Sequence, residues 1–319
     1  MFRHWFLAPS LFFALASSAC AAQDNASPTS MNRESLSDAW WTGPLIANSA
    51  GALPKGHFLI EPYLYDVRSP HVDSFGSLTY MEYGITDRWM AGLIPTFGYN
   101  RVANGPSSDH IEPGDLSILA QYSITSFHEG SAMPAMALMV QETLPTGRYD
   151  QLSHPLADAQ GNGAYTTTIQ LNTQTYFWLP NGRILRMRFN IGGSFSRDTS
   201  LRDVSVYATP QGFRGHASPG NGFLANAAWE YSMTQHWVLA FDLVYRYTSG
   251  GKVSGTVSTQ NATAPLNYRT GSSASFAFAP AIEYNWRANL GLLVGVRVFT
   301  GGHNSPTTVT PAIALNYVH

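Results

Sequence analysis

The sequence predicts an all-β protein, a transmembrane antiparallel up-and-down β-barrel of about 12 strands. Apolar and polar residues alternate in segment after segment, short connections alternate with long ones, and an export signal precedes them all. The composition agrees, because 12% of the residues are charged, 13% are aromatic and 28 of the 319 are glycine. The mean hydropathy of −0.11 excludes a bundle of membrane helices, each of which would need a run of about 20 apolar residues.

Residues 236–248 form the clearest predicted strand. Successive side chains alternate across a strand, and one face here carries Trp237, Leu239, Phe241, Leu243, Tyr245 and Tyr247. Aromatic residues lie at both ends of this face with apolar residues between them, which is the order expected for a strand that crosses a bilayer. The opposite face carries Asp242 and Arg246 and is predicted to line the inside of the barrel.

The other predicted strands show the same alternation, although residues 133–144 show it least clearly. Between the sixth and seventh strands, Asn181-Gly182 is typical of a hairpin turn, because both residues tolerate positive φ. In chain order the strands are expected at about residues 58–64, 78–85, 89–99, 116–124, 133–144, 165–178, 185–191, 223–231, 236–248, 276–284, 290–298 and 309–317. The total is even, as in single-chain bacterial barrels.

The connections between these strands alternate in length, as in barrels with short periplasmic turns and long external loops. Four tryptophans, Trp89, Trp178, Trp237 and Trp286, flank short turns and predict an aromatic girdle at the periplasmic interface. The short connections are expected near residues 86–88, 127–132, 179–183, 233–236 and 286–289. The long ones are expected near 67–76, 100–113, 145–163, 196–221 and 249–271, with 301–305 as a short exception.

The N-terminal sequence divides the chain into three predicted regions. Residues 1–22 read as a secretory signal peptide, in which Arg3 precedes an apolar run and small residues form the cleavage region. Residues 23–56 are expected to form a periplasmic N-terminal segment or a plug, and residues 57–319 the outer-membrane β-barrel. The only cysteine, Cys20, lies in the cleavage region, and lipidation at Cys20 is the alternative. If it leaves with the signal, the mature chain has no thiol.

Four short stretches are distinctive, namely Asp38-Ala39-Trp40-Trp41-Thr42-Gly43-Pro44, Gly84-Ile85-Thr86-Asp87-Arg88-Trp89, Gly114-Asp115-Leu116 and Leu144-Pro145-Thr146-Gly147-Arg148-Tyr149-Asp150. In these stretches the chain resembles the outer-membrane proteins named after the meta-cleavage pathway of phenol degradation. The resemblance covers roughly residues 38–319 and implies a transport protein without catalytic residues. Ile313, Leu315 and Tyr317 alternate as in strands that the barrel assembly machinery recognises, although the last residue is His319.

Charged residues on the inward face of the predicted strands are the candidate functional residues. One interpretation is a constriction whose charges select solutes, and the other is a set of cross-strand ion pairs that brace a narrow barrel. Both can hold, since twelve strands lie between filled and open barrels in size. The candidate lumen-lining residues are Glu61, Glu82, Asp115, Arg186, Arg188, Glu230, Asp242, Arg246, Glu283 and Arg297.

Catalytic and metal sites have weaker support. His216-Ala217-Ser218 has the His-x-Ser spacing of an outer-membrane phospholipase, but it falls in a predicted flexible loop, where a catalytic geometry is hard to hold. The histidines are scattered without a ligand-like pair on one strand, so no metal site is expected. No cofactor is expected either.

The sequence therefore predicts a bacterial outer-membrane channel or transporter for small solutes, which by family resemblance are hydrophobic or aromatic compounds. The expected partners are the outer-membrane bilayer, the barrel assembly machinery and a small-molecule solute. The formal charge of −2 gives no case for nucleic acid. Two alternatives stay open: a barrel-embedded, phospholipase-like hydrolase, and a non-conducting structural or surface-loop barrel.

Overall fold

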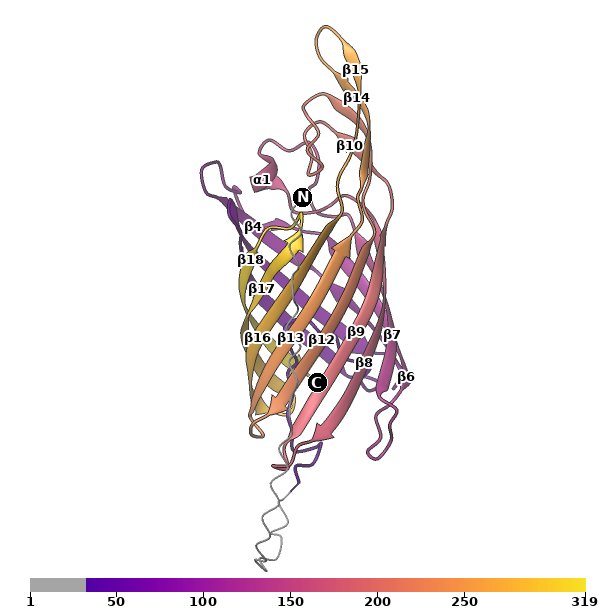
Figure 1. Ribbon diagram of the computed structural model, residues 1–319, viewed down its shortest axis with the longest axis vertical. Helices are drawn as coiled ribbons and strands as arrows, with labels where there is room; N and C mark the ends of the chain where they lie inside the picture. The colour runs from indigo at the N-terminus through magenta and orange to yellow at the C-terminus, as the bar shows by residue number, and fades with distance from the viewer. Residues whose placement is uncertain (1–32) are drawn as a thin grey trace, which may run out of the picture. The chain divides into compact units, whose positions relative to one another are not determined.

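The computed structural model describes residues 33–319, and these residues form a closed antiparallel β-barrel (Figure 1). The predicted signal peptide and residues 23–32 lie outside the described residues. In the main sheet, β3 and β4 are two halves of one strand, and β5 is only two residues long. Counted in this way, the wall of the barrel consists of twelve strands. The predicted fold class is confirmed. Within the described residues, no helix is long and apolar enough to cross a membrane.

The barrel strands follow one another around the wall in chain order, and β1 closes the barrel by pairing with both β2 and β18. Pro95, which has no N–H to donate, separates β3 from β4. The barrel strands are β1 (Phe58–Arg68), β2 (Val72–Gly84), β3 (Trp89–Ile94), β4 (Thr96–Val102), β6 (Leu116–Thr125), β7 (Ala135–Leu144), β8 (Thr166–Trp178), β9 (Ile184–Ser196), β12 (Gly222–Ser232), β13 (Trp237–Thr248), β16 (Ser273–Arg287), β17 (Leu290–His303) and β18 (Thr308–Val318).

The barrel has a turn end and a loop end. Short turns join the strands at the turn end, where β1 begins and β18 ends, and His319 N donates to Phe58 O at 2.9 Å. The loop end carries the long connections, with β5 (Glu112–Pro113), α1 (Pro155–Asp158), β10 (Thr199–Arg202), β11 (Phe213–Ser218), β14 (Lys252–Ser258) and β15 (Thr263–Arg269). In barrels of this kind the loop end is extracellular.

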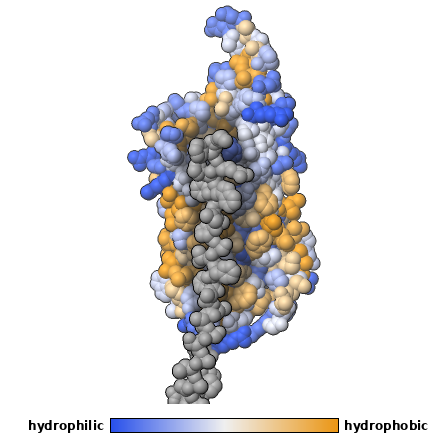
Figure 2. Space-filling view, viewed as in Figure 1, coloured by the Kyte–Doolittle hydropathy of each residue, from blue (hydrophilic) through white to orange (hydrophobic). Residues whose placement is uncertain are grey.

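The outward face of the barrel is apolar over its middle, and hydrophilic residues gather toward its ends (Figure 2). In β13, Leu239 is 46% exposed on this face, whereas its inward neighbours Val238 and Asp242 are fully buried. The register predicted for this strand therefore matches the structure. Trp89, Trp237 and Trp286 are exposed next to turns at the turn end, as an aromatic girdle requires.

Two residues of β7 explain why apolar and polar residues alternate less clearly in this strand than in the others. Met139 points inward and is buried although it is apolar, and it receives a hydrogen bond from Asn48 Nδ2 at 3.7 Å. Glu142 pairs with Ile118 and Thr167 near the loop end and accepts a hydrogen bond from the Thr167 hydroxyl at 2.6 Å. Met139 is thus an apolar residue on the inward face, and Glu142 is a charged residue on the outward face.

Two predictions about the connections are wrong. The expected long loop at 67–76 is a tight hairpin, because β1 and β2 continue to Arg68 and from Val72, and Ser69 Oγ donates to Val72 O at 2.6 Å. The connections at 196–221 and 249–271 are long, as expected, but the residues around His216 do not form the predicted flexible loop. Parts of both pair into a second sheet in the order β10-β11-β14-β15, which projects beyond the loop end (Figure 1).

Candidate functional site

Residues 39–53, called the lumen segment below, run inside the barrel without forming a helix or a strand. Ala39, Leu45, Ala47 and Ala50 of this segment are buried among inward-facing side chains of the barrel. An extended backbone with no ladder partner leaves its N–H and C=O groups to be satisfied by side chains. The lumen segment thus lies inside the barrel, where polar side chains of the barrel can satisfy its backbone.

Polar side chains on one side of the lumen bind the backbone of the lumen segment. Ala47 N donates to Asp242 Oδ1 of β13 at 3.0 Å, and Arg188 Nη1 of β9 donates to Ala47 O at 2.9 Å. Thr42 N donates to Glu283 Oε2 of β16 at 2.6 Å. Further bonds come from Asn285 to Trp40 O, from Asn190 to Asn48 O, and from Gln121 to Ser49 O and Gly51 O. Inward residues of β6, β9, β13 and β16 thus hold the segment along its length.

Arg186, Arg188 and Glu230 form a buried ion cluster beside this segment. Arg186 lies opposite Glu230 on the neighbouring strand and donates from Nε to Oε2 at 2.7 Å, with a second bond from Nη2 to Oε1. Arg188 Nε lies 3.0 Å from the same carboxylate. The Trp41 ring of the lumen segment covers the Arg186 guanidinium at 4.5 Å. For these three candidates, the structure shows the ion pairs that the bracing interpretation describes.

Glu61 of β1 and Glu82 of β2 lie on the other side of the lumen. Both face inward on neighbouring strands, since Glu61 pairs with Tyr80 and Glu82 with Leu59. Glu61 accepts a hydrogen bond from Asn316 Nδ2 at 3.0 Å, and neither carboxylate forms an ion pair within residues 33–319. Acidic groups without a basic partner thus line this side of the lumen.

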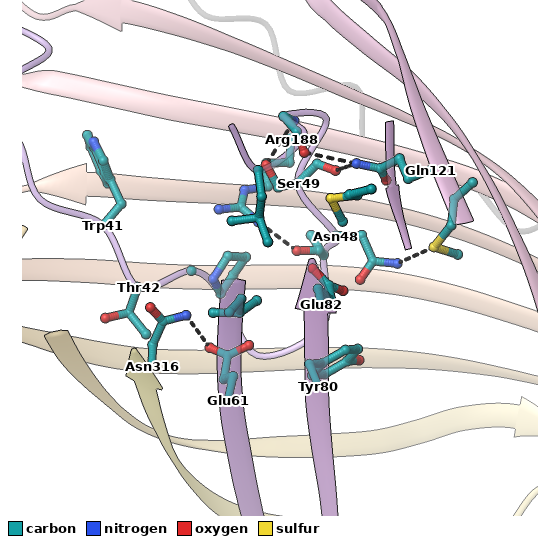
Figure 3. Close-up of a pocket in the computed structure, with 18 of the residues that line it drawn as sticks. Trp41, Thr42, Asn48, Ser49, Glu61, Tyr80, Glu82, Gln121, Arg188 and Asn316 are labelled. Atoms are coloured by element: carbon teal, nitrogen blue, oxygen red, sulfur yellow. Dashed lines mark hydrogen bonds between the residues drawn. The ribbon is translucent and has the colours of Figure 1, made fainter. Parts of the chain in front are cut away.

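A cavity of about 290 Å³ lies between the lumen segment and this side of the barrel. Figure 3 shows Glu61, Tyr80 and Glu82 on adjacent strands on one side of it, with Arg188 and Gln121 toward the other. The interior of an outer-membrane barrel is usually polar, yet much of this wall is apolar or aromatic. Its apolar and aromatic lining includes Leu53, Tyr63, Tyr80, Met90, Leu119 and Met139.

Two inward-facing glycines make room for the N-terminal part of the chain. A Cβ at Gly291 of β17 would collide with the Thr42 hydroxyl, and a Cβ at Gly84 of β2 would collide with the carbonyl oxygen of Pro54. The barrel wall is therefore shaped around this path of the chain.

Arg246 and Arg297 lie apart from the acidic candidates, toward the loop end. The guanidinium of Arg246 lies 4.4 Å from the Phe299 ring and that of Arg297 lies 5.6 Å from the Tyr65 ring. Neither forms an ion pair within the described residues, and Asp242, on the same strand as Arg246, binds the lumen segment instead. Arg246 and Asp242 thus share the inward face of β13, but no ion pair joins them.

Asp115 lies at the loop end, where it holds connections together and lines a second cavity with inward-facing residues such as Tyr65 and Ser117. Its carboxylate accepts hydrogen bonds from Gly147 N at 2.9 Å and Asn162 N at 3.0 Å. Burial raises the pKa of the Asp115 carboxyl, and these amide hydrogen bonds act in the opposite direction. Thr146 Oγ1 also donates to Gly114 O at 2.8 Å. Two of the distinctive sequence stretches thus bind each other.

The His216-Ala217-Ser218 triplet does not form a catalytic arrangement. It belongs to strand β11 rather than to a flexible loop, and the ring nitrogen Nδ1 of His216 lies 3.4 Å from the Ser200 hydroxyl of β10. In the part of the chain that the structure describes, no three His, Cys, Asp or Glu side chains are placed to hold a metal ion.

The family described as "Putative MetA-pathway of phenol degradation" matches residues 47–314. The chain belongs to this family. Its match spans the end of the lumen segment, the whole ion cluster and both glutamates of the cavity wall. No curated protein matches the chain in sequence.

Among solved structures, the family member described here is similar to the crystal structure of an outer membrane channel from Pseudomonas putida F1. The two chains are 15% identical, with a TM-score of 0.64 over 86% of this chain and 100% of that one. The similarity to the TodX deltaS2S3 mutant monoaromatic hydrocarbon channel has a lower TM-score of 0.44. These two chains are 11% identical, and the match covers 91% of this chain and 97% of that one. The NanC porin gives 9% identity and a TM-score of 0.45, over 81% of this chain and 98% of that one.

At these identities the likeness shows the barrel fold alone. A closed barrel satisfies its backbone groups internally, and this one presents an apolar outward face. The family member is accordingly a protein of the bacterial outer membrane.

Sequence reasoning missed the apolar wall of the cavity. Tyr80, Met90 and Leu119 fall on the inward register of their strands, where an apolar residue has no lipid to face. The signal was present in the alternation, since inward positions of neighbouring strands in one part of the barrel are apolar.

Proposed function

We propose that this protein is an outer-membrane channel for small hydrophobic or aromatic solutes. The cavity beside the lumen segment supports this proposal most strongly, because apolar and aromatic side chains such as Tyr80, Met90 and Leu119 lie on its wall among polar and charged ones. Sites that bind small molecules combine apolar and aromatic side chains with polar groups that fix the orientation of the ligand. An apolar cavity of about 150 Å³ holds benzene, so the volume of about 290 Å³ suffices for a substituted aromatic ring.

The lumen segment is the gate of the proposed channel. Its backbone hydrogen bonds to Asp242, Arg188 and Glu283 hold it across the lumen, so a solute passes only when this segment shifts. A chain segment held by single hydrogen bonds, each worth about 0.5–1.5 kcal/mol net and more to charged groups, can shift without unfolding the barrel.

The proposal includes the assignment of the chain regions. Residues 1–22 act as the signal peptide, residues 23–56 form the N-terminal segment whose later part enters the lumen, and residues 57–319 form the barrel. The barrel assembly machinery inserts it, with β18 as the strand that is recognised. The description of the family in terms of phenol degradation is in keeping with an aromatic solute.

The test is uptake of N-phenyl-1-naphthylamine, an apolar aromatic dye, by cells that produce the barrel. We expect faster uptake than in cells without it. Leu119→Trp, which fills the cavity, should lower this rate while leaving the amount of folded barrel unchanged. Leu138→Trp on the outward face is the matched control, because Leu138 is exposed and lies on the next strand.

The same preparation separates the alternatives. A hydrolase would cleave phospholipid in detergent micelles, and a structural barrel would neither bind the dye nor change its uptake. Equal uptake with Leu119→Trp and with the unchanged protein would contradict the cavity as the path.

A further inference from the structure

The second sheet at the loop end has one apolar and one basic face. The apolar face contains Leu201, Phe213, Ala217 and Val253, which are buried together. Paired residues of neighbouring antiparallel strands point to the same side, and the residues between these belong to the other face. That face, called the basic face below, carries Arg202, Arg214, His216, Lys252 and Arg269.

The cations of the basic face are exposed and have no acidic partner. None of Arg202, Arg214, Lys252 and Arg269 forms an ion pair within residues 33–319. The sequences of β10, β11, β14 and β15 contain no Asp or Glu at all. In a chain whose formal charge is −2, such a concentration of one sign calls for an explanation.

Nearby acids do not neutralise this face. Asp150 accepts a hydrogen bond from the backbone N–H of Arg202 at 2.9 Å, and Asp203 accepts bonds from Gln211 and Gly212. Asp198 is exposed just before β10, at the end of the strand nearest to the barrel. One exposed carboxylate stands against four arginine and lysine side chains.

The basic face points away from the mouth of the barrel. The apolar face packs against Tyr149, from the connection between β7 and β8, and against Tyr207, from the loop between β10 and β11. Lys252 follows the end of β13 by four residues and Arg269 precedes β16 by four, so both lie close to the rim. Since an extended chain spans at most about 3.3 Å per residue, they stand within about 13 Å of the barrel strands, with Arg214 and Arg202 farther out.

We propose that the basic face binds the phosphate groups of glycolipids in the outer leaflet that surrounds the barrel. Phosphate oxygens accept charge-assisted hydrogen bonds from arginine and lysine, and the exposed Asn267 offers a further polar group on the same face. The position next to the rim favours a membrane lipid over a soluble polymer. The bound lipid fixes the projecting sheet to its surroundings, a role that is separate from conduction.

The experiment measures binding of deep-rough lipopolysaccharide, which keeps the lipid A phosphates, to the purified full-length barrel in non-ionic detergent. The variant Arg214→Gln/Lys252→Gln/Arg269→Gln should bind about 100-fold more weakly, since each cation near an anionic lipid surface contributes about fivefold. Lys55→Gln/Arg88→Gln/Arg287→Gln removes the same charge at exposed positions of the turn end and should leave the dissociation constant unchanged. Folding is checked for each variant by heat-modifiable mobility on a gel.

Any one of four results would overturn the proposal. Equal losses in the two triple variants would mean that net charge rather than this face sets the affinity. Binding of dephosphorylated lipopolysaccharide would exclude lipid phosphate as the partner. Heparin that binds with the same affinity through the same three residues would exclude it as well. An unchanged dissociation constant in the loop-end variant would contradict any role of the basic face.

Discussion

Arg186 and Glu230 lie opposite each other on β9 and β12 and join through two side-chain hydrogen bonds inside the barrel, one of them 2.7 Å long. Arg188 shares the same carboxylate, so one buried anion serves two buried cations. This cluster also carries part of the lumen segment, since Arg188 donates to Ala47 O. Bracing and positioning of the gate are therefore combined in these residues.

Glu230→Gln should destabilise the barrel strongly, because it leaves two buried guanidinium groups without their anion. Breaking a buried ion pair from one side costs about 3–5 kcal/mol. The pair of Arg33 and Glu129, exposed on both sides, is the control, and Glu129→Gln should cost about 0–1 kcal/mol. Urea unfolding followed by heat-modifiable mobility measures both changes. Similar midpoints for the two variants would show that the cluster does not stabilise the fold.

Phe241→Arg should destabilise the inserted barrel by about 2–4 kcal/mol, because Phe241 faces lipid near the middle of β13. Tyr247→Arg, on the same face of the same strand but near the loop end, should cost about 0–1 kcal/mol. Reversible unfolding in phospholipid vesicles compares the two free energies. Equal costs would place the membrane at a different height on the barrel.

Glu61→Gln/Glu82→Gln should make the channel less selective for cations, because both carboxylates line the cavity without a basic partner. Arg246→Gln should make the channel more selective for cations, because it removes a positive charge. Arg246 lies toward the loop end beside Phe299 and apart from these acids. The reversal potential across an asymmetric salt gradient at pH 8.5 reports both. Shifts of the same sign would contradict this assignment, because the loss of two acids and the loss of a base change the charge of the lumen in opposite directions.

The strand alternation predicted much of this structure. A period of two residues fixes which side chains share a face, so the sequence alone placed Asp242, Glu230 and Glu283 on the side opposite to the lipid-facing residues. Their position inside the barrel follows from closure of the sheet. Their role in selectivity stays a prediction, because alternation does not tell what each carboxylate contacts.

The contacts of the lumen could not be read from strand periodicity. The lumen segment has no regular structure, and its backbone binds residues such as Asp242 and Gln121 that are distant in sequence. Alternation places Val238 on the inward face of β13 but does not show that its side chain is fully buried. The second sheet escaped prediction because its strands are short and rich in Gly, Ser and Thr, which also suit loops.

A reversible cross-link between Thr42 and Gly291 tests the central claim, that the lumen segment is the gate, most directly. A Cβ at Gly291 would lie 3.3 Å from Thr42 Cβ, close to the separation of about 3.5–4.5 Å that a disulfide needs. In Thr42→Cys/Gly291→Cys, oxidation should abolish dye uptake and reduction by dithiothreitol should restore it, while each single variant stays insensitive to both. Uptake that continues at the same rate through the oxidised, cross-linked barrel would contradict the account.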